Sequence, residues 1–185
     1  MADFQKAFLK TMGAEGGYSN DPDDRGGETY RGIARKFHPD WPGWKIIDAL
    51  KSYLSDLRRW TPTAEMNNLV EEFYKEKFWD VFRGDSIQDQ PIAEEIFDSG
   101  VNFGSSTEGK ILQRAINVAC GTTLTVDGKV GPATIAALND ADQRGRDSIL
   151  WAMNTLQGMR YIEDVEDNPS QRKYLRGGWK ERARS

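Results

Sequence analysis

Apolar residues recur at the spacing of an α-helix along most of the chain. Phe4, Phe8 and Met12 begin the pattern, which predicts a first helix over residues 3–15 that stops at Gly16-Gly17. Stripes of the same period follow downstream, and they predict about eight helices in all. The predicted fold class is therefore mainly α.

Capping signals add boundaries to these helices. Thr61-Pro62 is typical of an N-cap followed by proline at the first helical position, and the helix it opens is predicted to run to Gly84. Ser105–Glu108 has the form of a capping box, with Gly121 just past the end of its helix. A short helix is also expected over residues 30–38.

One segment breaks the helical pattern. Residues 16–32 are rich in glycine, asparagine and aspartate, too polar to form a core element. This composition predicts a small polar loop or β-hairpin directly after the first helix.

Charge and hydropathy exclude several classes of partner. The 185 residues carry 25 Lys+Arg against 29 Asp+Glu, a formal net charge of −4, so no overall basic field would steer the chain onto nucleic acid. No stretch approaches the roughly 20 apolar residues that cross a bilayer, so stable membrane insertion is not expected. The basic tail over residues 171–185 is more simply explained by pairing with the acidic stretch 163–167.

Metal and cofactor chemistry finds little support. The single Cys120 allows no internal disulfide and is expected to be a small buried hydrophobe, and the single His38 argues against a His/Cys zinc site. A calcium loop starting at Asp21 fails because its fifth and twelfth positions are Arg25 and Gly32. No metal or cofactor is expected.

Glu15 is the first candidate catalytic residue. It lies in the last turn of the expected first helix, where backbone carbonyls present negative partial charge. That field and burial against the neighbouring aromatic residues disfavour ionisation, so we expect a raised pKa. A carboxylic acid that keeps its proton near neutral pH can act as a general acid.

Asp24 and Thr29 complete the candidate set. Asp24 stands beside Arg25 in a polar turn, which favours its ionised form, and Thr29 can hold a water or a sugar hydroxyl. One neutral and one charged carboxyl is the division of labour used to cleave glycosidic bonds. Tyr18 and Tyr30 flank the loop, either as sugar-stacking rings or as packing residues. An ordinary solvated turn accounts for the same composition, and that alternative stays open.

The run EGGYSNDPDDRGGETYRGI at residues 15–33 resembles the signature of glycoside hydrolase family 108, the N-acetylmuramidases that include phage endolysins and secretion activator proteins. The spacing of Glu15, Asp24 and Thr29 is also similar to the Glu–Asp–Thr arrangement of phage-type lysozymes, with one residue fewer between the last two. Ala34 departs from the pattern, which has a hydroxyl residue there. Residues 97–104, 112–115, 126–134 and 177–179 look like the predicted peptidoglycan-binding half of the family.

The resemblance implies a lysozyme-like helical fold, with a muramidase region over residues 1–88 and a helical peptidoglycan-binding region over 89–185, packed together as one compact unit. It implies hydrolysis of the β-1,4 bond between N-acetylmuramic acid and N-acetylglucosamine, with Glu15 as general acid. Asn102, which lies in the motif at residues 97–104, joins Tyr18 and Tyr30 as a candidate substrate contact.

The resemblance leaves two other functions open: a non-catalytic peptidoglycan-binding or secretion-accessory protein, and a lytic transglycosylase. Residues 1–10 lack the basic, apolar and small-residue regions of a secretory signal. We therefore expect synthesis in the bacterial cytoplasm without a signal peptide and action on the wall in the periplasm. Export that depends on a holin is what the family suggests.

Overall fold

The computed structural model describes residues 1–12, 17–20, 27–54 and 56–172. Packing divides the chain into two compact units. The hairpin unit is Phe8–Lys77, and the helical unit is Met1–Ala7 together with Phe78–Ser185. The division into regions 1–88 and 89–185 stays a prediction.

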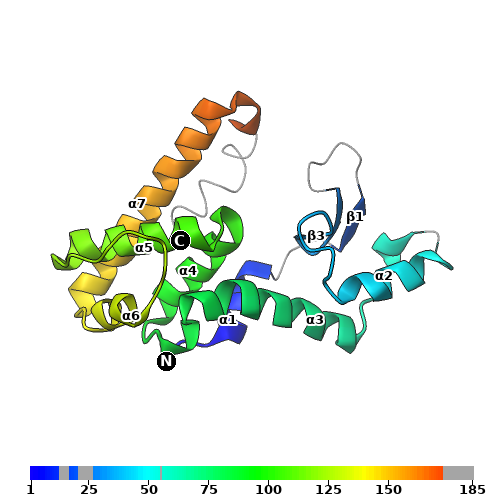
Figure 1. Cartoon of the computed structure of the whole chain (residues 1–185), viewed down its shortest axis with the longest axis horizontal. Helices are drawn as coiled ribbons and strands as arrows, with labels where there is room; N and C mark the ends of the chain where they lie inside the picture. The colour runs from blue at the N-terminus through cyan, green and yellow to red at the C-terminus, as the bar shows by residue number, and fades with distance from the viewer. Residues whose placement is uncertain (13–16, 21–26, 55, 173–185) are drawn as a thin grey trace. The chain divides into compact units, whose positions relative to one another are not determined.

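The hairpin unit joins a small sheet to helices (Figure 1). Its elements are the end of α1 (Phe4–Met12), β1 (Tyr18–Asn20), β2 (Glu28–Tyr30), β3 (Ile33–Ala34), α2 (Gly43–Lys51), the 3-10 turn η1 (Leu57–Arg59) and α3 (Ala64–Tyr74). The strands are antiparallel in the order β1-β2-β3. A mainly α fold with a small hairpin after the first helix is thereby confirmed.

In the part of the chain that the structure describes, the helical unit combines the start of α1 with further helices and short connecting turns. Its elements are the end of the π-helical turn η2 (Lys75–Trp79), the 3-10 turns η3 (Asp80–Phe82) and η4 (Gly84–Ser86), α4 (Gln90–Phe103), α5 (Ser105–Cys120), α6 (Pro132–Asn139), α7 (Gln143–Asp167) and η5 (Pro169–Gln171). Among the described residues, no helix combines the length and apolar character needed to span a membrane.

Each unit buries its own aromatic cluster. In the hairpin unit the indole of Trp41 meets Tyr30 at 6.1 Å, Trp44 at 5.2 Å and Phe73 at 6.4 Å between ring centroids. In the helical unit the start of α1 is anchored because Phe4 packs edge-on against Trp79, 5.6 Å away, and Phe97, 5.8 Å away. Such edge-to-face pairs add to the stabilisation that burial alone provides.

The short helix expected over residues 30–38 is wrong. Tyr30 ends β2, and Ile33–Ala34 forms β3. Between them Arg31 and Gly32 both have positive φ, 44° and 79°, which is the backbone of a tight hairpin turn rather than of a right-handed helix. The helical spacing of the local apolar residues misled the prediction because these strands are only two or three residues long.

Two further boundaries differ from those expected. The N-cap of α3 is Thr63, whose hydroxyl accepts a hydrogen bond from the Met66 amide at 3.3 Å, and not Thr61. The regular α-helix ends at Tyr74 and gives way to π and 3-10 turns up to Phe82, after which Arg83 adopts a left-handed conformation. The prediction of one unbroken helix to Gly84 is therefore wrong.

Helix α5 confirms one capping prediction, and it corrects a second one and the predicted burial of Cys120. Gly121 ends it in a left-handed conformation, as expected, with φ of 66°. Its N-cap is Gly104, and Glu108 lies fully buried instead of closing a capping box. Cys120 is exposed, so its prediction as a buried residue is also wrong.

Helices α5 and α7 run antiparallel and pack along their length (Figure 1). Gln157 of α7 donates a hydrogen bond to Oε1 of Glu108 at 3.3 Å, near one end of the pair. Near the other end a Cβ added to Gly145 would lie 3.6 Å from the sulfur of Cys120. A Cβ at this distance would make an ordinary van der Waals contact, so the start of α7 lies beside the end of α5.

Glu108 is a carboxylic acid that is fully buried between helices. Its Oε2 atom has no hydrogen-bond partner among the described residues, and its side chain is 0% exposed. Burial, reinforced by the negative charges of Glu95 and Asp98 on α4, raises the pKa of Glu108 well above 4.5. Above about pH 4.5 the folded protein therefore keeps a proton on Glu108 that the unfolded chain releases.

We expect Glu108→Gln to stabilise the protein more as pH rises. The folded pKa is raised, so wild-type stability falls as pH increases above about 4.5, and the amide abolishes this contribution. Urea unfolding followed by circular dichroism should show the variant gaining about 1 kcal/mol or more at about pH 8 relative to about pH 5.

Glu166→Gln, at an exposed position of α7, is the control and should follow wild type. Equal pH dependence in wild type and Glu108→Gln would contradict the presence of a retained proton.

Candidate active site

The sheet that flanks the candidate loop is fixed by a tight turn. Tyr30 pairs with Ile33 across the two-residue turn formed by Arg31 and Gly32. The hydroxyl of Tyr74, at the end of α3, donates a hydrogen bond to the Arg31 carbonyl at 2.7 Å. Gly32 lies against this hydroxyl so closely that a Cβ there would be 2.6 Å from the oxygen. Helix α3 thus holds the turn between β2 and β3.

The pairing of β1 with β2 sets which side chains share a face. Tyr18 is opposite Tyr30, and Ser19 is opposite Thr29. Successive side chains of a strand point to opposite faces, so Tyr18 and Tyr30 share one face while Thr29 lies on the other.

Thr29 is half-buried in the central strand. Its hydroxyl donates to the Gly27 carbonyl at 3.1 Å, which leaves the oxygen lone pairs to accept a hydrogen bond from water or from a sugar hydroxyl. Gly27 itself has a φ of 63°, which a residue without Cβ adopts easily.

The face of the sheet that carries Tyr18 and Tyr30 also carries a network of ion pairs, which the sequence did not reveal. Glu28 is bound by Arg35, with Nε to Oε2 at 2.7 Å, and also by Lys51 at the end of α2. The Arg35 guanidinium donates two hydrogen bonds to the Asp48 carboxylate, at 3.0 and 2.6 Å. Its central carbon lies 4.5 Å from the centroid of the Trp44 ring. Strand β2, the segment after β3 and helix α2 are thereby connected through the carboxylate next to Thr29.

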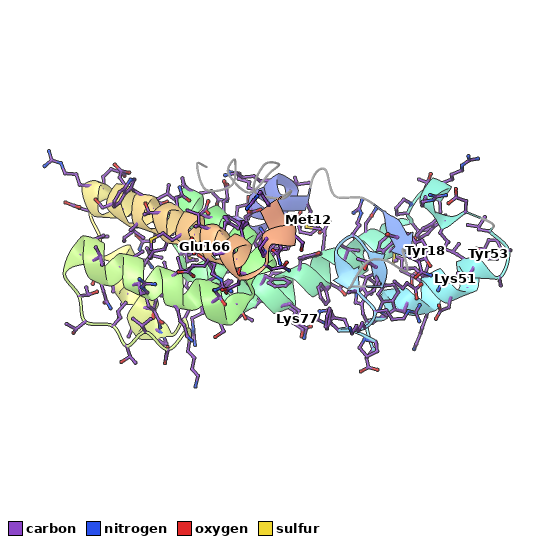
Figure 2. All side chains as sticks on the ribbon, turned by 90° about the horizontal axis from the view of Figure 1, so that it is seen from above. Met12, Tyr18, Lys51, Tyr53, Lys77 and Glu166 are labelled. Carbon is purple, nitrogen blue, oxygen red and sulfur yellow. The ribbon has the colours of Figure 1, made fainter. Side chains whose placement is uncertain are left out.

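Tyr18 sits at the edge of this network, close to Lys51 (Figure 2). Its pKa is raised, first by partial burial and then by its hydrogen bond to Glu28. The Lys51 ammonium lies 5.8 Å from the ring centroid. Tyr18 is half-exposed and keeps ring surface available to a ligand.

Tyr30 and Asn102 occupy different settings. Tyr30 is 1% exposed, with Trp41 and Trp60 beside its ring, so in this structure it packs the core of the hairpin unit. Asn102 is exposed on α4 of the helical unit, where its amide donates to the Asp98 carbonyl at 2.7 Å. Their roles as substrate contacts stay predictions.

Glu15 and Asp24 lie outside the described residues. The described chain borders them closely in sequence, with Met12 and Gly17 around the first, and Asn20 and Gly27 around the second. The amide of Arg31 donates to the Gly17 carbonyl at 3.1 Å, which extends the pairing of the sheet to the residue that follows the Glu15 segment.

The hairpin unit also contains a hollow of about 390 Å³. Residues 37–42, the second half of α3 and residues 76 and 77 of η2 line it. Among them is His38, whose ring meets Phe73 edge-on at 4.7 Å. Partial burial and then the charge of Lys77 lower the pKa of His38. Among the described residues, no three His, Cys, Asp or Glu side chains come together in a way that could hold a metal ion.

Comparison with known proteins identifies the class. The Glycosyl hydrolase 108 model matches residues 8–104, so the chain belongs to this family of glycoside hydrolases. A Predicted Peptidoglycan domain matches residues 108–184. Together the two matches support peptidoglycan hydrolysis as the general activity. No curated protein matches the chain.

The fold is shared with solved structures, of which ten chains match. One is described as "Structure of Brucella abortus SagA"; it is 21% identical, with a TM-score of 0.56, over 97% of this chain and 92% of that chain. At this identity the likeness shows the fold alone.

We expect Gly32→Ala to destabilise the hairpin unit more than Gly27→Ala. Both glycines have positive φ, which costs an alanine about 1 kcal/mol, but among the residues that the structure describes only Gly32 has a close neighbour for the new Cβ, the Tyr74 hydroxyl. Urea unfolding followed by tryptophan fluorescence should show at least about 1 kcal/mol between the two variants.

The same contact can be tested in a Tyr74→Phe background. There the nearest remaining atom to the Cβ is the ring carbon Cζ at 3.9 Å, so the extra cost at Gly32 should disappear. An unchanged difference between the glycine variants would show that Tyr74 does not constrain the turn.

Proposed function

We propose that the chain is an N-acetylmuramidase that hydrolyses the β-1,4 bond between N-acetylmuramic acid and N-acetylglucosamine in peptidoglycan. The observation that carries this proposal is the combination of the family match with the signature run of residues 15–33, whose described part forms the sheet held by α3. The specific bond is chosen because this run resembles the muramidase signature.

In the proposed reaction Glu15 donates its proton to the leaving glycosidic oxygen. Asp24 stabilises the positive charge that develops at the anomeric carbon, or activates the attacking water. Thr29 positions that water by accepting a hydrogen bond from it, because its own hydroxyl hydrogen is directed to Gly27. The proposed steps use only this chain's own residues, the glycan and water.

The proposal includes the place of action. The substrate is the bacterial cell wall, so the protein acts in the periplasm after synthesis in the cytoplasm. Release through a membrane pore of the holin type would bring it there.

We expect Glu15→Gln to lower the rate of release of reducing ends from purified peptidoglycan by about 10²–10⁴-fold, because the amide cannot donate the required proton. Circular dichroism should show an unchanged fold. Glu65→Gln, which replaces an exposed carboxyl on α3 of the hairpin unit, is the matched control and should keep full activity. Near-normal activity of Glu15→Gln would refute the assignment.

Mass spectrometry of the products from the wild-type protein tests the reaction itself. Reducing N-acetylmuramic acid ends would support the muramidase proposal. Anhydro-muropeptides would identify a lytic transglycosylase instead, and binding to peptidoglycan without any cleavage would identify a non-catalytic wall-binding protein.

A further inference from the structure

A groove runs between two antiparallel helices of the helical unit. It has a volume of about 360 Å³. Helix α5 contributes Thr107, Lys110, Ile111 and Arg114. Helix α7 contributes Leu156, Met159, Arg160 and Glu163. Both sets follow the i, i+3, i+4, i+7 spacing of a single helical face, so the groove is lined by one continuous stripe from each helix.

The floor of the groove is apolar and its α5 side is cationic. Ile111 is 5% exposed, whereas Met159 is 52% exposed and offers its thioether to solvent. Lys110 and Arg114 are both exposed and stand one helical turn apart, so their side chains are neighbours. The groove therefore offers two adjacent cations above an aliphatic surface.

Lys110 and Arg114 differ from Arg160, the third cationic residue of the groove, in their ion-pair partners. Arg160 binds Asp164 at 2.9 Å and Glu163 at 3.5 Å on its own helix. Neither Lys110 nor Arg114 forms an ion pair with any residue that the structure describes. The full chain has a net charge of −4, so two adjacent cations without such partners are a local feature rather than a reflection of overall composition.

We propose that this groove binds the stem peptides of peptidoglycan through their carboxylates. The inference rests on the proposed function, because it takes peptidoglycan as the substrate. Lys110 and Arg114 donate charge-assisted hydrogen bonds to the carboxylates, and Arg114 can engage one of them through two parallel bonds. The short aliphatic side chains of a stem peptide pack on Ile111 and Met159.

The groove lies within the region that matches the predicted peptidoglycan domain, residues 108–184, apart from Thr107. The domain match names the polymer, whereas the groove specifies which chemical part of that polymer is bound. In intact wall the lactyl carboxyl of N-acetylmuramic acid is part of the amide bond to the stem peptide, so the glycan strand itself is neutral and the free carboxylates are on the peptide. The groove therefore adds affinity for wall whose stem peptides carry free carboxylates.

Binding of the full chain to purified sacculi tests the proposal. In co-sedimentation at low temperature, the double variant Lys110→Gln/Arg114→Gln should bind intact sacculi about tenfold more weakly than wild type, because two charge-assisted contacts are lost. The matched control Lys129→Gln/Arg144→Gln removes the same charge from two other exposed positions of the helical unit and should bind normally. Lys110→Arg/Arg114→Lys, which keeps both charges, should restore most of the binding.

Chemically altered sacculi identify the ligand. Amidation of the peptide carboxylates should weaken wild-type binding to the level of the groove variant and leave the binding of the variant itself unchanged. Loss of binding after removal of phosphodiester polymers would instead identify a phosphate ligand and overturn the proposal. Equal binding by the groove variant and its control would also overturn it.

A separate measurement keeps this test distinct from the proposed function. The groove variant should cleave peptide-free glycan strands at the wild-type rate, because neither Lys110 nor Arg114 belongs to the proposed catalytic set. If wild type cleaves no glycan but still binds peptide-bearing sacculi through the groove, the muramidase proposal fails and the groove proposal stands. If wild type cleaves glycan but its binding to sacculi does not depend on the groove, the groove proposal fails and the muramidase proposal stands.

Discussion

The close contact between Tyr74 and the turn at Arg31–Gly32 is the constraint on which the candidate site depends. A sheet of three very short strands has little stability of its own, so an outside element must hold it. The Tyr74 hydroxyl does so with one hydrogen bond to a backbone carbonyl, at a glycine that leaves no space for a side chain. Helix α3 in turn is held by the aromatic cluster around Trp41 and Phe73.

The charged network around Glu28 fixes the other end of the same strand. Glu28 precedes Thr29 directly, and its carboxylate is shared by Arg35 and Lys51 from two different segments. Surface ion pairs contribute little singly, but the Glu28 side chain is 14% exposed, and several partners converge on it. Thr29 is therefore held between a backbone turn on one side and a charge network on the other.

Helical periodicity predicted much of the fold, because α1, α4, α5 and α7 bury long apolar stripes whose spacing is visible in the sequence. It failed at residues 30–38, where strands of two or three residues are too short to show alternation. The motif at residues 15–33 located the candidate site. The Glu28–Arg35 pair could not be predicted because it depends on the hairpin turn between β2 and β3, which the helical reading of residues 30–38 missed. The burial of Glu108 could not be predicted because it depends on a partner distant in sequence.

Helix α5 shows how one element serves both stability and recognition. Its inner face carries Glu108, whose burial costs stability unless the carboxyl keeps its proton, and its outer face carries Lys110 and Arg114. The two roles are separable because the inner residue meets Gln157 of α7 while the outer residues line the groove. Substitutions at Lys110 and Arg114 can therefore change wall binding without changing the packing of α5 on α7, so a loss of binding there reports recognition and not unfolding.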